Sequence, residues 1–91
     1  GYSIAEPFWG RGYIPEAVRV LIDYLFTEYA VERLQARVFV GNDASDRVLE
    51  KLGFTKEGVL RSVVFRRGAW LDLTMWSLLR FEWQSRATST V

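Results

Sequence analysis

The feature that most constrains the fold is an amphipathic helix flanked by two strand-like segments. From Pro15 onward one face of the helix is apolar, because its apolar residues recur every three or four positions: Val18, Leu21, Ile22, Leu25, Phe26 and Tyr29. Segments 2–5 and 33–40 on either side alternate in polarity, as strands with one buried face do. A strand, a helix and a strand in this order predict two parallel strands joined by a right-handed crossover.

A second, shorter helix is predicted after the second strand. Asn42 and Asp43 are good N-cap residues, because their side chains accept hydrogen bonds from the first free N–H groups of a helix. The helix runs through Leu52. Gly53 is suited to the left-handed conformation that ends many helices, so we expect this helix to end there.

The remaining residues predict a hairpin. Segments 58–67 and 69–80 are rich in β-branched and aromatic residues, and Arg67 and Gly68 between them suit a tight turn. Residues 84–91 are small and polar without periodicity, so we expect them to form a frayed tail. The predicted order is β-α-β-α-β-β, an α/β (α+β) fold with a mixed sheet, in one domain over residues 1–83.

The 91 residues include no cysteine and no histidine. Thiol nucleophiles, disulfides, Ser-His-Asp triads and ordinary zinc sites are therefore excluded within this chain. The net charge is +1, with basic and acidic residues intermixed, and no apolar run is long enough to span a bilayer. We expect no metal, no nucleic-acid partner and no membrane partner. Because no leader segment is recognisable, we also expect a cytoplasmic location.

The most informative local motif is the stretch FWGRGYIPEA at residues 8–17. It places Gly10 and Gly12 just before a helix start, where unpaired backbone N–H groups and the helix dipole attract an anion such as phosphate. A plain glycine turn is the alternative for this stretch taken alone. The motif lacks the lysine and Ser/Thr of a P-loop and the spacing of a dinucleotide fingerprint, which disfavours other classes of nucleotide binder.

This loop and two later segments resemble one enzyme family. WGRGYIPEAV at residues 9–18, LEKLGFTKEGVLR at residues 49–61 and AWLDLTMWSLLRFEW at residues 69–83 are similar to segments of the Gcn5-related N-acetyltransferases (GNAT). The similarity is greatest to the branch that acetylates the N-termini of ribosomal proteins, and it covers residues 2–83. It implies that residues 1–83 form the C-terminal half of a GNAT acyl-CoA acyltransferase fold.

The resemblance also implies a site for acetyl-coenzyme A. Backbone N–H groups of the glycine loop would bind the pyrophosphate, and the strand before it would pair with the pantetheine arm. Pro7 stands where the family commonly has glutamine or arginine. We therefore do not expect the side-chain contact to phosphate that the resemblance implies at this position. The alternative role of Asn42 is N-capping, and that of Arg11 is a solvent-facing side chain. The implied coenzyme A-binding residues are Ile4, Ala5, Glu6, Trp9, Gly10, Arg11, Gly12, Tyr13, Asn42 and Ser45.

The resemblance implies only some of the catalytic groups. Many members carry a tyrosine as proton donor where this chain has Leu49, and in the ribosomal-protein branch a serine at the position of Ser45 has that role. An exposed serine in the first helical turn is the alternative for Ser45. Some branch members carry a carboxylate base where this chain has Val64. We expect Glu57 in a turn and Asp72 in the hairpin, and we assign neither as the base.

We therefore expect an acetyl-coenzyme A-dependent N-acetyltransferase that works by direct attack of a primary amine, because no cysteine or Ser-His pair is present to form an acyl-enzyme. The missing base favours the α-amine of a protein N-terminus, whose pKa of about 8 lies below the value of about 10.4 for lysine. The alternatives are a polyamine or small-molecule acceptor, and a coenzyme A-binding module without activity.

Two expectations concern surfaces. Phe65, Trp70 and Trp76 in the hairpin could line an acceptor groove, with core packing as the alternative. The strand at residues 2–5 would expose an unpaired edge, and small domains bury a small fraction of their surface. We therefore expect that a longer parent protein, a second copy in a homodimer or an exchanged strand covers this edge.

Overall fold

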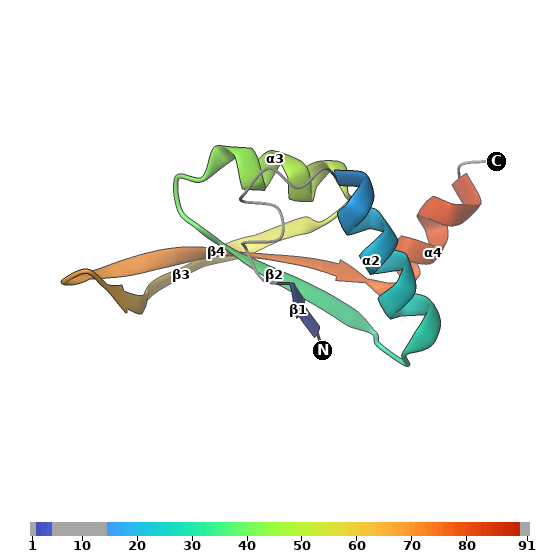
Figure 1. The fold of residues 1–91 in the computed structure, drawn as a ribbon, viewed down its shortest axis with the longest axis horizontal. Coiled ribbons are helices and arrows are strands. Elements are labelled where there is room, and N and C mark those ends of the chain that lie inside the picture. Colours follow the sequence, from blue (N-terminus) through green and yellow to red (C-terminus); the bar gives the residue numbers. More distant parts are fainter. Residues whose placement is uncertain (1, 5–14, 90–91) are drawn as a thin grey trace.

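The computed structural model describes residues 2–4 and 15–89. They form a sheet with α2 and α3 on one of its faces, and a long hairpin of β3 and β4 extends from one end (Figure 1). In chain order the elements are β1 (Tyr2–Ile4), α2 (Pro15–Glu28), β2 (Arg33–Phe39), α3 (Asp43–Lys51), β3 (Thr55–Arg66), β4 (Ala69–Leu79) and α4 (Arg80–Ser89).

The strands form one mixed sheet in the order β1-β2-β4-β3. β1 runs parallel to β2, with Ile4 opposite Ala36, whereas β4 is antiparallel to both β2 and β3. The hairpin turns at Arg67 and Gly68, whose φ angles of 51° and 80° are both positive, as a tight two-residue hairpin turn requires. The predicted parallel pair, mixed sheet and hairpin are confirmed.

The core lies between the sheet and helices α2 and α3. Alternate residues of β2 (Leu34, Ala36 and Val38) are fully buried, because they point to the face that the helices cover. The other residues of β2 point to the opposite face, which no helix covers in the described part of the chain (Figure 1). The buried residues of β2 pack in one cluster with Val18, Ile22 and Phe26 of α2, Leu49 and Leu52 of α3, and Trp76 and Leu78 of β4.

Helix α3 begins and ends close to where the sequence predicts, because residues at its two ends cap it. Asn42 Oδ1 accepts a hydrogen bond from the N–H of Ser45 at 3.2 Å, which caps the helix N-terminus. At the other end Gly53 has a φ of 94°, a left-handed conformation that favours glycine, and its N–H donates to the carbonyl of Glu50. Both ends of the helix are thus determined by residues within a few positions of them.

β3 begins at Thr55, and the prediction that Glu57 lies in a turn was wrong. Glu57 falls at a register shift inside β3, and its carboxylate reaches across the sheet. Arg33 donates two hydrogen bonds to it, at 2.6 and 2.9 Å, and the Oγ of Ser77 donates a third at 2.5 Å. These long-range contacts hold the segment in the strand.

The prediction of a frayed tail after residue 83 was wrong where the structure describes it, because Arg80–Ser89 forms helix α4. Trp83 stacks on Phe26 of α2, with ring centroids 5.1 Å apart, and its Nε1 donates to Asp23 Oδ1 at 2.7 Å. Packing of one aromatic side chain against α2 therefore stabilises a helix that local periodicity does not indicate.

The Arg33–Glu57 pair makes stability depend on pH. Hydrogen bonds from Arg33 and Ser77 lower the pKa of Glu57 from 4.5 to about 2. A carboxylate with a lowered pKa stabilises the folded state above its ordinary pKa, and this contribution is lost as the pH falls towards the lowered value.

We expect the Glu57→Gln variant to be less stable than the wild type near neutral pH, and the difference to shrink as the pH falls from about 5 to about 2. Urea unfolding at a series of pH values measures it. The Arg33→Gln variant is the control, because it removes the main cause of the pKa shift. If the difference in unfolding free energy between Glu57→Gln and the wild type stayed constant down to about pH 2, it would contradict the lowered pKa of Glu57.

Candidate functional site

Among the predicted site residues, Ile4, Asn42 and Ser45 lie in the described part of the chain. Ile4 ends β1, whereas Asn42 and Ser45 lie at the beginning of α3. The described part of the candidate site therefore comprises the parallel strand pair and the first turn of α3. The remaining predicted residues lie outside the described residues: Ala5, Glu6, Trp9, Gly10, Arg11, Gly12 and Tyr13.

A tight turn connects the buried end of β2 to α3. Gly41 has a φ of 99°, and the N–H of Asn42 donates to the carbonyl of Phe39 at 3.1 Å. Residues with a side chain rarely adopt this φ, so the reversal depends on a glycine. The N-cap role of Asn42 is confirmed, and its contact with coenzyme A stays a prediction.

Ser45 is a buried polar residue in the first turn of α3. Its exposed fraction is 1%, so the alternative of an exposed serine was wrong. Within the described residues its Oγ has no hydrogen-bond partner. A buried hydroxyl without a partner costs about 1–3 kcal/mol, and such groups are rare in folded proteins. Within the described residues this hydroxyl therefore lacks the hydrogen bond that a buried polar group normally makes.

The first turn of α3 is fastened to the sheet by one side-chain hydrogen bond. The Nε1 of Trp76 on β4 donates to Asp46 Oδ1 at 3.1 Å, across 30 positions of the sequence. Trp76 is 5% exposed, and a buried indole N–H needs an acceptor. Sequence reasoning missed this pair; the only local signal is an acidic residue in a helix's first turn, where the helix dipole favours it.

The aromatic residues of the hairpin separate into two groups. Trp76 packs in the core, which confirms core packing, the alternative to an acceptor groove, for this residue. Phe65 and Trp70 are about 60% exposed and contact each other edge to face, with ring centroids 5.3 Å apart. Both aromatic side chains are therefore exposed to solvent on the hairpin.

The two carboxylates near the sheet are both engaged in structural contacts. Glu57 is held by Arg33 and Ser77, and Asp72 Oδ1 accepts a hydrogen bond from the N–H of Ser62 at 2.7 Å. Ser62 has a φ of 49° at an irregularity of β3, and this bond stabilises it there. Asp72 thus has a structural role in the hairpin where it was predicted to lie.

Two further observations concern metal ligands and membrane-spanning helices. In this part of the chain, no three His, Cys, Asp or Glu residues come together in a group that could hold a metal ion. None of the helices formed by residues 15–89 is long and apolar enough to cross a membrane.

The sequence compares directly with one family of enzymes. Residues 1–55 match the profile of the Acetyltransferase (GNAT) domain. The chain belongs to the GNAT acetyltransferase family. The match includes the parallel strand pair, the glycine loop and α3, so the family assignment rests on the same segments as the candidate site.

Two curated GNAT relatives align over most of the chain. It is 41% identical over 83 residues to an uncharacterized N-acetyltransferase, p20, of Bacillus licheniformis, covering 91% of this chain and 47% of the relative. It is 31% identical over 83 residues to the ribosomal protein uS5-alanine N-acetyltransferase of Escherichia coli, covering 91% of this chain and 43% of the relative. The chain thus spans about half the length of the curated relatives it matches.

Solved GNAT structures share the fold. The spermidine/spermine N-acetyltransferase of Vibrio cholerae superposes with a TM-score of 0.77 at 23% identity, over 92% of this chain and 53% of that protein. At this level of identity the comparison shows the fold alone. The strand and helix order of this chain is therefore that of a GNAT acetyltransferase.

The hydrogen bond between Trp76 and Asp46 gives a stability prediction. We expect Trp76→Phe, which keeps an aromatic ring but removes the N–H, to lower the free energy of unfolding by about 1–3 kcal/mol. Asp46→Asn keeps an acceptor and should cost less. Trp70→Phe, at an exposed position, is the matched control, with an expected change within about 0.5 kcal/mol. Urea unfolding measures all three, and equal effects of the two tryptophan variants would contradict a role for this bond.

Proposed function

We propose that the protein transfers the acetyl group of acetyl-coenzyme A to a primary amine, and that its acceptor is the N-terminal α-amine of a polypeptide. The single observation that carries the proposal is the buried hydroxyl of Ser45, without a partner in the described residues, in the first turn of α3 of a GNAT chain. The similarity to the enzyme that acetylates alanine of ribosomal protein uS5 supports a polypeptide acceptor.

The donor supplies an acetyl group activated as a thioester. In this proposal the backbone N–H groups of Gly10, Arg11, Gly12 and Tyr13 bind its pyrophosphate, because a glycine loop before a helix lets an anion approach the backbone. The other proposed contacts lie along the pantetheine arm and at its thiol end. They involve Ile4, Ala5, Glu6, Trp9, Asn42 and Ser45.

The proposed role of Ser45 is that of proton donor. The acceptor nitrogen forms a bond to the carbonyl carbon, the carbon–sulfur bond breaks, and the Oγ of Ser45 gives its proton to the departing sulfur. The proton that the nitrogen loses then restores the hydroxyl through water. The buried Oγ suits this role, because within the described residues no other group accepts its proton.

The proposed acceptor preference follows from the state of the two carboxylates of the described hairpin, Glu57 and Asp72. Glu57 and Asp72 are both bound to other groups of the hairpin and sheet. An α-amine with a pKa of about 8 is partly neutral at cellular pH, whereas a lysine side chain at about 10.4 is not. With Glu57 and Asp72 both engaged in structural contacts, we favour an α-amine over more basic amines as the acceptor.

A transfer assay with mass-spectrometric detection tests the proposal. We expect acetylation at the α-amine of unblocked peptides, and no product with spermidine or with N-terminally blocked lysine peptides. Ser45→Ala should lower kcat about 100-fold, the size expected for loss of a general acid. Ser62→Ala is the matched control, because Ser62 contributes only its backbone N–H to the contact with Asp72.

Three results would count against the proposal. Product with spermidine alone would favour a polyamine acceptor. Binding of acetyl-coenzyme A without turnover on any amine would favour an inactive binding module. An unchanged kcat in Ser45→Ala would remove Ser45 as the proton donor.

A further inference from the structure

The face of β2 that no described helix covers carries two arginines in different states. Arg33 and Arg37 lie on this same face, four residues apart in the strand. Arg33 is neutralised by Glu57, with an N–O distance of 2.6 Å. The side chain of Arg37 is exposed and, within residues 16–85, makes no hydrogen bond or ion pair. The charge of Arg37 is therefore available to a ligand.

A third arginine reaches the same region from the hairpin. The guanidinium carbon of Arg66 lies 5.3 Å from the ring centroid of Phe39, which follows Arg37 by two positions and shares its face. Arg66 pairs with Ala69 beside the hairpin turn, so the hairpin places this charge at the end of β2. One exposed cation, Arg66, thus stacks on the ring of Phe39, and a second, Arg37, lies on the same strand face.

An apolar hollow adjoins these cations. It has a volume of about 420 Å³ and is lined by Phe39, Val40, Trp70, Leu71 and Asp72. Val40 and Trp70 are more than half exposed, although both are apolar. The one carboxylate at the hollow belongs to Asp72, whose Oδ1 already accepts the N–H of Ser62. Beside this one carboxylate lie Arg66, stacked on Phe39 of the lining, and Arg37, two positions before Phe39 on the same strand face.

The hollow lies at the end of the sheet that the candidate site occupies. The last described pair between β1 and β2 is Ile4 with Ala36, and Arg37 and Phe39 come directly after it. Two residues later the chain turns at Gly41 into α3. The end of β2 that carries the hollow is thus the end from which the chain turns into α3.

We propose that Arg37, Phe39, Arg66 and the hollow beside them bind an acidic segment of the acceptor polypeptide. The carboxylates of the segment contact the two guanidinium groups, and one of its apolar side chains sits in the hollow against Phe39 and Leu71. Charge complementarity supports an acidic occupant, and the apolar lining supports a polypeptide over a nucleic acid. The inference rests on the proposed function, because it takes a polypeptide as acceptor.

Calorimetric titration of the purified protein with two peptides tests the inference. One peptide has a free N-terminus followed by several Asp and Glu residues and a leucine, and in the other lysines replace the acidic residues. We expect tighter binding of the acidic peptide, and about tenfold weaker binding of it by Arg37→Glu and by Arg66→Glu. The preference should weaken as salt is added.

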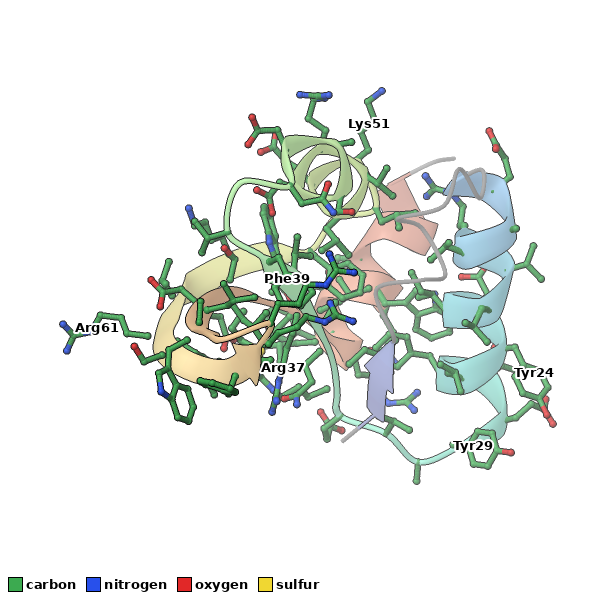
Figure 2. The ribbon with its side chains drawn as sticks, turned by 60° about the vertical axis from the view of Figure 1, so that its left-hand side comes forward. Tyr24, Tyr29, Arg37, Phe39, Lys51 and Arg61 are labelled. Carbon is green, nitrogen blue, oxygen red and sulfur yellow. The ribbon has the colours of Figure 1, made fainter. Side chains whose placement is uncertain are left out.

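The matched controls are charge reversals elsewhere on the surface. Arg61 is exposed and extends away from the ribbon, and Lys51 lies at the end of α3 (Figure 2). Arg61→Glu and Lys51→Glu change the net charge as Arg37→Glu does, and we expect neither to alter peptide affinity. Circular dichroism confirms that every variant is folded.

Several outcomes would overturn the inference. One is equal affinity of the protein for the two peptides. A second is a loss of peptide affinity in Arg61→Glu or Lys51→Glu as large as that in Arg37→Glu. A third is tighter binding of an oligonucleotide of the same charge. Acetyl transfer without preference for acidic peptides would refute this surface and leave the proposed function standing. Specific binding of the acidic peptide without any transfer would support the surface and refute the proposed function.

Discussion

The structure depends on the burial of one face of β2. Leu34, Ala36 and Val38 have no exposed surface beneath α2 and α3, and removal of apolar surface from water is the main favourable contribution to folding. Because strand residues alternate in direction, the same burial forces the charged residues of β2 to the opposite face. One alternating segment thus determines both the side that holds the fold together and the side that carries Arg33 and Arg37.

The same core also positions the candidate site. Leu49 holds α3 in the core, the bond from Trp76 to Asp46 fastens its first turn to β4, and Asn42 caps that turn. Three independent contacts therefore fix the place of the Ser45 hydroxyl. Such fixing suits the proton transfer that we propose for Ser45, because a displacement of about 1 Å can cost about 100-fold in rate.

Features set by neighbouring residues could be predicted from the sequence, and features set by distant ones could not. The cap at Asn42 and the strand–helix order follow from local patterns, and both are confirmed. The strand position of Glu57 depends on Arg33, 24 positions away, and α4 depends on the packing of Trp83 against α2. The burial of Ser45 likewise follows from how α3 sits on the sheet, which the serine's own neighbours do not reveal.

The central claim is that this chain holds acetyl-coenzyme A through its glycine loop and the first turn of α3. The most direct test is a calorimetric titration of acetyl-coenzyme A into the protein and into a variant carrying Gly10→Val and Gly12→Val, after circular dichroism has shown both to be folded. The account predicts saturable binding by the wild type and its loss in the variant, because added side chains keep the phosphates from the backbone. Equal affinity of the two, or no binding by the folded wild type, would contradict it.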